Sequence, residues 1–250
     1  MSRYRLFLQA LAFPVLLFGC RFLSINPYAN LVHPSNRIIT EQRPVGSFTG
    51  IDMGTIGRVI INQGEFESLS VKGSDNIVPL VKTEVKNGVL MIGMDKNVDF
   101  TGMKPDNLLT FNITIKDLNQ LTLSGAGNIS VDTLSTQDFI VVMSGAGQVV
   151  LNDFSAISLN TQIFGVGNVN ISGEVDTANV EITGVGNFNG PKLKIEKAEI
   201  SISGLGEAEV WVTDTLTGDI SGNGTVKYFG SPKIHTTDTG VGGFSSIGDK

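Results

Sequence analysis

Ser124-Gly125-Ala126-Gly127-Asn128-Ile129 decides the fold, because it returns as Ser144-Gly145-Ala146-Gly147-Gln148-Val149 and then five more times in altered form. The first glycines of the seven units are separated by 20, 20, 19, 20, 18 and 18 residues. Self-similarity at a fixed period of this length indicates a repeat architecture. The glycines that we predict to turn the chain are Gly125, Gly127, Gly145, Gly147, Gly165, Gly167, Gly184, Gly186, Gly204, Gly206, Gly222 and Gly224, and the seventh unit adds Gly240 and Gly242.

Apolar and polar residues alternate on both sides of each Gly-x-Gly unit. Four residues after the first glycine come Ile129, Val149, Val169, Phe188, Ala208, Val226 and Phe244. Two residues before it come Leu123, Met143, Ile163, Ile182, Ile202 and Ile220, until Asp238 ends the series. A period of two with one apolar face is typical of a half-buried strand. Each repeat is therefore predicted to hold at least two short strands, with a corner between them at which Gly takes a positive φ without a Cβ clash.

These patterns predict an all-β fold, a parallel β-helix (β-solenoid) with coils of about 18–20 residues and Gly-x-Gly corners. Stacked coils would lie about 4.8 Å apart. Residues 117–246 are the regular coils, and residues 46–116 are irregular opening coils that cap the stack. Together with the closing cap at Lys233–Lys250 they form one domain over 46–250. The alternative is an antiparallel meander or propeller of 20-residue hairpins, although propeller blades usually need about 40 residues.

The N-terminus is typical of an export signal. Arg3 and Arg5 precede an apolar run from Leu6 to Phe18, which is short for a membrane span and ends close to Cys20, the only cysteine. We predict a signal peptide over 1–19, lipidation of Cys20 after cleavage, and a Pro- and Asn-containing tether over 20–45. An uncleaved anchor and a plain secretory signal are the alternatives. The cleaved chain would hold 16 Lys and Arg against 24 Asp and Glu, a formal net charge of −8.

Composition and charge exclude several classes of function. Lys and Arg are absent between Lys116 and Lys192, so the chain lacks the clustered cations that a nucleic-acid partner requires. The Gly-x-Gly units precede strands and not helices, and no Lys lies near them before Lys227, so a nucleotide-binding loop is not expected. We predict no cofactor and no metal site, because Asn, Gln, Glu or Thr follows the units where calcium-binding repeats place Asp.

The same reading predicts no enzyme. Glu207 and Glu209 lie two residues apart on one strand, and Asp219 and Asp238 flank neighbouring turns, so these are the carboxylates that we consider for glycosidic chemistry. Two acids on the solvent side of a strand are more typical of a solubilising face. Arg58 is the last arginine of the chain, so an enzyme acting on acidic sugars would lack its usual cations.

A polar column follows the glycine corners and is the candidate binding surface. Its members, together with one outward-facing aromatic residue, are Asn128, Gln148, Asn168, Asn187, Glu207 and Trp211. Stacked amides hydrogen-bond along a β-stack and stabilise it, which is the structural explanation of the column. The functional explanation is a polar strip that binds a glycan or a protein. A large outward-facing aromatic side chain such as Trp211 often marks a contact surface.

The repeated Ser-Gly-Ala-Gly-Asn-Ile run, the entry Phe48-Thr49-Gly50-Ile51 and the close Val226-Lys227-Tyr228-Phe229-Gly230-Ser231-Pro232 resemble the bacterial DUF2807 family. This family is also called the auto-transporter adhesin head GIN domain. The resemblance covers roughly residues 46–246 and implies a β-helix fold, with a lipoprotein or secretory signal in many members. It implies no catalytic residue.

The leading hypothesis is a non-enzymatic lipoprotein of the cell envelope, exported and held at the membrane by its N-terminal lipid. Its solenoid surface would serve adhesion or bind a glycan or surface protein. A structural envelope component that self-associates is one alternative, and a carbohydrate-active β-helix enzyme is another.

Overall fold

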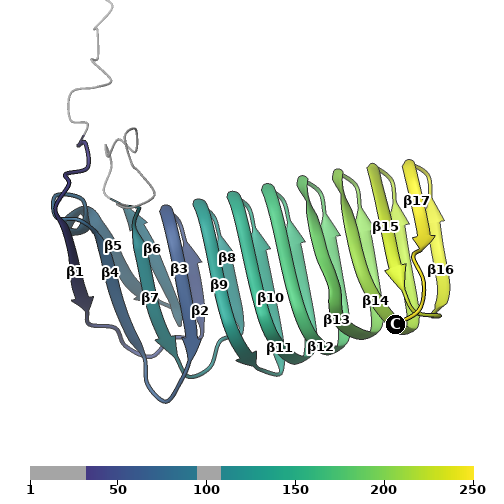
Figure 1. Cartoon of the computed structure of the whole chain (residues 1–250), viewed down its shortest axis with the longest axis horizontal. Helices are drawn as coiled ribbons and strands as arrows, with labels where there is room; N and C mark the ends of the chain where they lie inside the picture. Colours follow the sequence, from purple (N-terminus) through teal and green to yellow (C-terminus); the bar gives the residue numbers. More distant parts are fainter. Residues whose placement is uncertain (1–31, 95–107) are drawn as a thin grey trace, which may run out of the picture. The chain divides into compact units, whose positions relative to one another are not determined.

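The computed structural model describes residues 32–94 and 108–250, all within one compact unit spanning Leu31–Lys250. The predicted signal peptide 1–19, Cys20 and the tether up to residue 31 lie outside the described residues. The described part forms a β-solenoid, whose coils stack along the horizontal axis of Figure 1. The parallel β-helix and the short, nearly regular coils predicted from the sequence are thereby confirmed.

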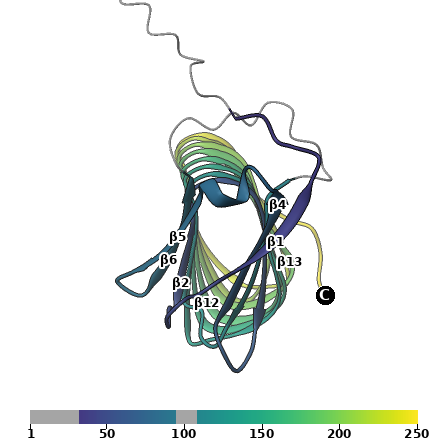
Figure 2. The ribbon, with the colours of Figure 1, turned by 90° about the vertical axis from the view of Figure 1, so that its left-hand side faces the viewer.

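Each coil contributes one strand segment to each of two faces that enclose the core (Figure 2). Face A contains, in order of pairing, β1 (Ile38–Arg43), β4 (Ser68–Ser74), β7 (Thr110–Ile115), β3 (Ile56–Gln63), β9 (Ala126–Ser135), the first halves of β11 (Ala146–Ile163), β12 (Val166–Ile182), β13 (Val185–Ile202) and β14 (Leu205–Ile220), then β15 (Asn223–Phe229) and β17 (Val241–Ser246). Face B contains β5 (Val81–Lys86), β6 (Val89–Met94), β2 (Gly50–Met53), β8 (Gln120–Leu123), β10 (Asp138–Met143), the second halves of β11 to β14, and β16 (Lys233–Asp238).

The two ends of each coil differ in structure. At the Gly-x-Gly edge two residues separate the end of one strand from the start of the next coil, for example Ser144 and Gly145 between β10 and β11. At the opposite edge β11, β12, β13 and β14 run continuously around the bend, so that a single long strand serves both faces. Small register shifts absorb the different coil lengths there, for example between Gly190 and Lys194. The two short strands predicted for each repeat are thus joined in the middle of the stack.

Close approach of the coils explains the corner glycines. A Cβ atom on Gly145, Gly165 or Gly184 would collide with the backbone carbonyl oxygen of the preceding coil's equivalent glycine. Positive φ is a secondary reason, because Gly167 has a φ of 158° whereas Gly184 has no left-handed φ. These positions require glycine mainly because it has no side chain, and less because it can adopt a positive φ. This corrects the explanation by positive φ that the sequence predicted.

The opening coil is assembled from distant segments. β2 ends before Gly54, β3 begins at Ile56, and Gly57 pairs in register with Gly127 of the first regular coil. Between these coils in the sequence come β4 to β7, which extend the stack on its N-terminal side, where β6 pairs with β2 and β7 with β3. In this segment β4 pairs antiparallel with both β1 and β7, and β5 forms a hairpin with β6. The turn η1 (Val78–Leu80) lies between β4 and β5. Antiparallel pairing thus covers the N-terminal end of the core.

The core is a continuous column of aliphatic side chains with aromatic residues at intervals. Phe111, Phe139, Phe154 and Phe188 are fully buried, and the rings of Phe139 and Phe154 lie 5.4 Å apart. At the C-terminal end, the chain predicted to close the stack forms one more coil. β16 pairs parallel with β14, and β17 with β15. Every residue of β16 is exposed, and Asp238 occupies the inward position of this last coil. No helix in residues 32–94 and 108–250 is long and apolar enough to cross a membrane.

Candidate functional site

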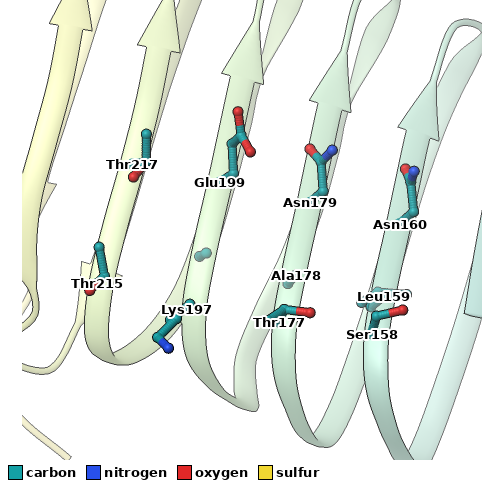
Figure 3. Close-up of a pocket in the computed structure, with 11 residues that line it drawn as sticks. Ser158, Leu159, Asn160, Thr177, Ala178, Asn179, Lys197, Glu199, Thr215 and Thr217 are labelled. Atoms are coloured by element: carbon teal, nitrogen blue, oxygen red, sulfur yellow. The ribbon is translucent and has the colours of Figure 1, made fainter. Parts of the chain in front are cut away.

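A groove runs along the stack axis on face B, across β11, β12, β13 and β14 (Figure 3). It has a volume of about 440 Å³, within the range typical of ligand pockets. Two outward rows of side chains border it, and the inward-pointing Leu159, Ala178 and Ala198 form its floor. The rows are Ser158, Thr177, Lys197 and Thr215, and Asn160, Asn179, Glu199 and Thr217.

Strand register aligns the members of each row. Asn160 pairs with Asn179, and Asn179 with Glu199, so that one polar group appears in each coil at the same height. Coil spacing in a β-stack is about 4.8 Å, which sets the distance between successive groups along the groove. The groove therefore offers a regular series of hydroxyl, amide and charged groups to a ligand that extends along the stack.

The amides of this groove have hydrogen-bonding capacity to spare. Within the part of the chain that the structure describes, the side chains of Asn160 and Asn179 form no hydrogen bond with another residue. Neighbouring hydroxyls are engaged: Ser158 Oγ donates to Asp138 Oδ1 at 2.5 Å, and Thr177 Oγ1 donates to the carbonyl oxygen of Ile157 at 3.3 Å. Each free amide offers two donor hydrogens and one acceptor oxygen.

Face A behaves differently, although it carries the column singled out by the sequence. Register stacks Asn128, Gln148, Asn168, Asn187 and Glu207 in one line. Within it, Asn187 Nδ2 donates to Asn168 Oδ1 at 2.9 Å, and the backbone N–H of Glu207 donates to Asn187 Oδ1 at 3.0 Å. A parallel pair joins Asn189 Nδ2 to Asn170 Oδ1 at 2.8 Å. The Asn168–Asn187 and Asn170–Asn189 bonds join neighbouring coils and stabilise the stack, although Asn170 Nδ2 is buried without a partner. The side chains of Asn128 and Gln148 form no hydrogen bond within the described residues.

The acidic pair of the sequence lies next to an ammonium group. Lys227 Nζ is 2.7 Å from Glu207 Oε1 and donates a hydrogen bond to it, which together with the charges of Glu207 and then Glu209 raises the pKa of Lys227 above 10.5. No group of three or more His, Cys, Asp or Glu side chains able to hold a metal ion occurs among residues 32–94 and 108–250.

Trp211 lies on face A, paired with Phe229 of the following coil. Its side chain is half-buried. The ammonium of Lys250 lies 5.5 Å from the Trp211 ring centroid and 4.4 Å from that of Phe229, and it donates to the carbonyl oxygen of Pro191. The C-terminal residue therefore covers the aromatic surface that the sequence singles out. Tyr228 packs against the core from a partly buried position.

The polar residues of the face B groove recur at a fixed position in the repeat, which the sequence analysis did not single out. Asn160, Asn179 and Glu199 each stand five residues before the first glycine of a unit. Their polarity is ordinary for an outward strand position, so only the structure distinguishes them from other solvent-facing residues.

Comparison with known proteins places the fold in a family. The model of DUF2807, described as "Putative auto-transporter adhesin, head GIN domain", matches residues 47–232. The chain belongs to this family. A crystal structure of a putative adhesin from Bacteroides fragilis is 30% identical, with a TM-score of 0.81, and the match covers 86% of this chain and 100% of that one. No curated protein matches the sequence.

Two further solved structures share the fold. A putative adhesin from Parabacteroides merdae is 20% identical with a TM-score of 0.66, over 88% of this chain and 100% of that one. A putative lipid binding protein from Parabacteroides distasonis is 20% identical with a TM-score of 0.69, and the match covers 87% of this chain and 100% of that one. The family predicted from the sequence is confirmed. Membership in an adhesin family indicates a non-enzymatic, exported protein of the surface or envelope.

Proposed function

We propose that this DUF2807 protein is a lipid-anchored adhesin of the cell envelope, and that its face B groove binds an extended, uncharged glycan chain. The observation that carries the proposal is the pair of unbonded amides, Asn160 and Asn179, aligned in successive coils of the groove. Polar groups that are not used within the protein are available to a ligand, whereas those of the Asn168–Asn187 ladder are already satisfied.

Groove electrostatics support an uncharged ligand. Lys197 and Glu199 contribute one charge of each sign to the lining, and the remaining lining residues are neutral. Hydroxyl, amide and charged side chains together can donate and accept hydrogen bonds along a polyhydroxylated chain. A strongly acidic or basic polymer would gain little net attraction in such a groove.

The shape of the groove supports an extended ligand. It is lined from four neighbouring strands, β11 to β14, and its polar rows run across these strands and along the stack. A chain molecule lying along this direction can repeat the same contact in each coil, which gives affinity through several weak hydrogen bonds. The family is described as a putative adhesin, and so is a relative that is 30% identical. Both descriptions agree with such a binding role.

A glycan array followed by calorimetry on the purified full chain tests the proposal. The double variant Asn160→Ala/Asn179→Ala is expected to lower the affinity for the selected glycan about tenfold or more, because two hydrogen-bonding amides are lost. Asn128→Ala on face A is the matched control and should leave affinity unchanged. Absence of any glycan ligand, together with unchanged cell attachment after gene deletion, would overturn the proposal. Binding of a polypeptide in the same groove would replace glycan by protein as the partner.

The anchor has a test of its own. Metabolic labelling with a palmitate analogue should mark the wild-type chain and fail to mark Cys20→Ser. An unlabelled wild-type chain would remove the lipid anchor from the proposal without affecting the groove.

A further inference from the structure

The Gly-x-Gly edge carries an exposed apolar ridge. Register stacks the middle residues of the units in one column, which consists of Ile56, Ala126, Ala146, Val166, Val185, Leu205, Asn223 and Val241. Val166, Val185 and Leu205 are 59%, 49% and 55% exposed, and the adjacent Phe164 is 47% exposed. Four large apolar side chains therefore protrude side by side over three successive coils, where the close-packed glycines allow no alternative burial.

The seven Gly-x-Gly corner units are free of charge; the charged residues of this edge, Arg37 and Asp75, belong to the N-terminal cap and pair with each other at 3.8 Å. The seven corner units read SGAG, SGAG, FGVG, TGVG, SGLG, SGNG and TGVG, without an acidic or basic residue. Their polar members are small hydroxyl side chains and one Asn. Such a composition, apolar with a few hydroxyl groups, suits the boundary between lipid headgroups and acyl chains.

The opposite edge, where β11 to β14 bend, is strongly charged. The bends of these four strands carry five carboxylates and three ammonium groups, from Asp153, Glu174, Asp176, Glu196, Asp214, Lys192, Lys194 and Lys197. The exposed large apolar residues of this edge among residues 32–94 and 108–250 are Ile157 and, in the opening coil, Phe66. A net acidic edge is repelled by the anionic surface of a bacterial membrane and is most favourable when it points away from it.

The N-terminal chain leaves the solenoid at the Gly-x-Gly edge. β1 begins at Ile38, and its Thr40 pairs with Lys72, which pairs with Thr110. Thr110 in turn pairs with Arg58, and Arg58 pairs with Asn128, the residue after Gly127. Ile38 is therefore level with the corner residues, and residues 32–37 emerge on this edge, as both views show at the upper end of the coils (Figures 1 and 2). Eleven residues lie between Cys20 and Val32, so the chain between them reaches at most about 40 Å.

We propose that the Gly-x-Gly edge rests on a lipid bilayer, with Phe164, Val166, Val185 and Leu205 entering the interfacial layer and the acidic edge facing away. A short anchor attached on the same side holds this edge near the lipid, and the ridge then fixes the orientation of the solenoid. Both faces, including the face B groove, stand roughly upright on the membrane and stay accessible.

A bilayer fits this ridge better than a second copy of the protein. The ridge is one residue wide in each coil and lies on a convex corner, whereas a stable protein interface buries about 1,200–2,000 Å² of surface. Lipid headgroups and acyl chains adapt to a narrow ridge, and interfacial binding grows with the apolar area that enters them. Lipid is therefore the occupant to test.

Quenching of a fluorophore by brominated lipids measures which edge contacts the bilayer. The full chain carries Cys20→Ser and a single labelled cysteine, at Leu205→Cys on the ridge or at Asp153→Cys on the acidic edge. Vesicles contain phosphatidylethanolamine and phosphatidylglycerol with brominated acyl chains. Since both variants share the same N-terminus, any difference reports on the orientation of the solenoid. We expect several-fold stronger quenching at Leu205→Cys, and Val166→Cys should repeat this result if one labelled variant folds poorly.

Substitution of the ridge supplies the second measurement. Val185→Ser/Leu205→Ser is expected to abolish the difference in quenching between labels placed at Val166→Cys and at Asp153→Cys, while circular dichroism stays unchanged. Equal quenching at both edges of the unsubstituted ridge overturns the proposal. The proposal is also overturned if the emission of the label at Leu205→Cys shifts to the blue with rising protein concentration and without vesicles. That result would place a second copy of the protein on the ridge. Glycan binding is measured without vesicles, so failure of either proposal leaves the other intact.

Discussion

Asn187 donates its side-chain amide to Asn168 one coil below, at 2.9 Å, and accepts the backbone N–H of Glu207 one coil above, at 3.0 Å. One side chain therefore links three coils on face A. Such a ladder restrains the register of these parallel strands. It adds to the restraint that the backbone hydrogen bonds between adjacent coils already supply.

Asn187→Ala is expected to reduce the free energy of unfolding by about 1–3 kcal/mol, because it leaves the Glu207 N–H and the Asn168 carbonyl group without their partners. Urea unfolding followed by circular dichroism measures the change. Asn128→Ala serves as the control, since Asn128 is exposed and its side chain forms no hydrogen bond with a described residue. Equal losses for the two variants would show that the ladder contributes nothing beyond an ordinary surface residue.

Gly184→Ala separates steric approach from backbone conformation as the reason for the corner glycines. Gly184 has no left-handed φ, but its added Cβ would meet the carbonyl oxygens of Phe164 and Gly165. We expect a loss of about 3 kcal/mol or more in the free energy of unfolding, as for severe overpacking. Gly93→Ala is the matched control, because nothing lies within 4 Å of its added Cβ. A Gly184→Ala chain as stable as the control would restore the conformational explanation.

Thr161→Val is expected to stabilise the protein. Thr161 is fully buried on face B between the core residues Val141 and Val180, and its hydroxyl has no hydrogen-bond partner among the described residues. Replacing the hydroxyl by a methyl group of the same shape removes the desolvation cost, with a gain of about 1 kcal/mol in unfolding free energy. Thr213→Val, which loses a hydrogen bond to the Ile195 carbonyl oxygen at 3.2 Å, should not stabilise. Destabilisation by Thr161→Val would point to an internal water on the hydroxyl.

Glu207→Gln is expected to lower the pKa of Lys227 toward 10.5, because the hydrogen bond and charge of Glu207 hold it above that value. A raised Lys pKa means that the folded state binds the proton more tightly than the unfolded state. The resulting stabilisation is complete below pH 10.5 and disappears as the pH rises through the pKa of folded Lys227. NMR titration of the lysine side chain measures the pKa directly. An unchanged pKa in Glu207→Gln would assign the shift to Glu209.

Sequence periodicity predicted the regular part of the fold because stacked coils repeat the same local environment. Leu123, Met143 and Ile163 occupy equivalent inward positions, so an alternating pattern that recurs every 18–20 residues specifies both strand direction and coil length. The opening coil could not be found in this way. Gly57 pairs with Gly127 across an intervening excursion of β4 to β7, and no local pattern records a pairing between such distant residues.

For the candidate sites too, the sequence predicted which residues face outward, and the structure determined which of them are available. Alternation identified Asn168 and Asn187 as outward residues of one column, but hydrogen bonds between coils determine that their amides are already used. Asn160 and Asn179 are also outward-facing asparagines, yet their side-chain amides form no hydrogen bond within the described residues and border a groove. Trp211 shows the converse: its outward position was predicted, but Lys250, remote in sequence, covers its ring.

The sequence by itself determined that this chain is a Gly-x-Gly solenoid, because inward and outward positions follow from local alternation and from a repeat period. Only the tertiary structure decided what the glycines and polar rows do. The glycines allow backbone contact between coils, which exposes the residues between them as an apolar ridge, and the stacking register leaves one set of amides bonded and another free. Both outcomes depend on how closely and in which register adjacent coils stack. The sequence of one coil does not specify its distance from the next coil.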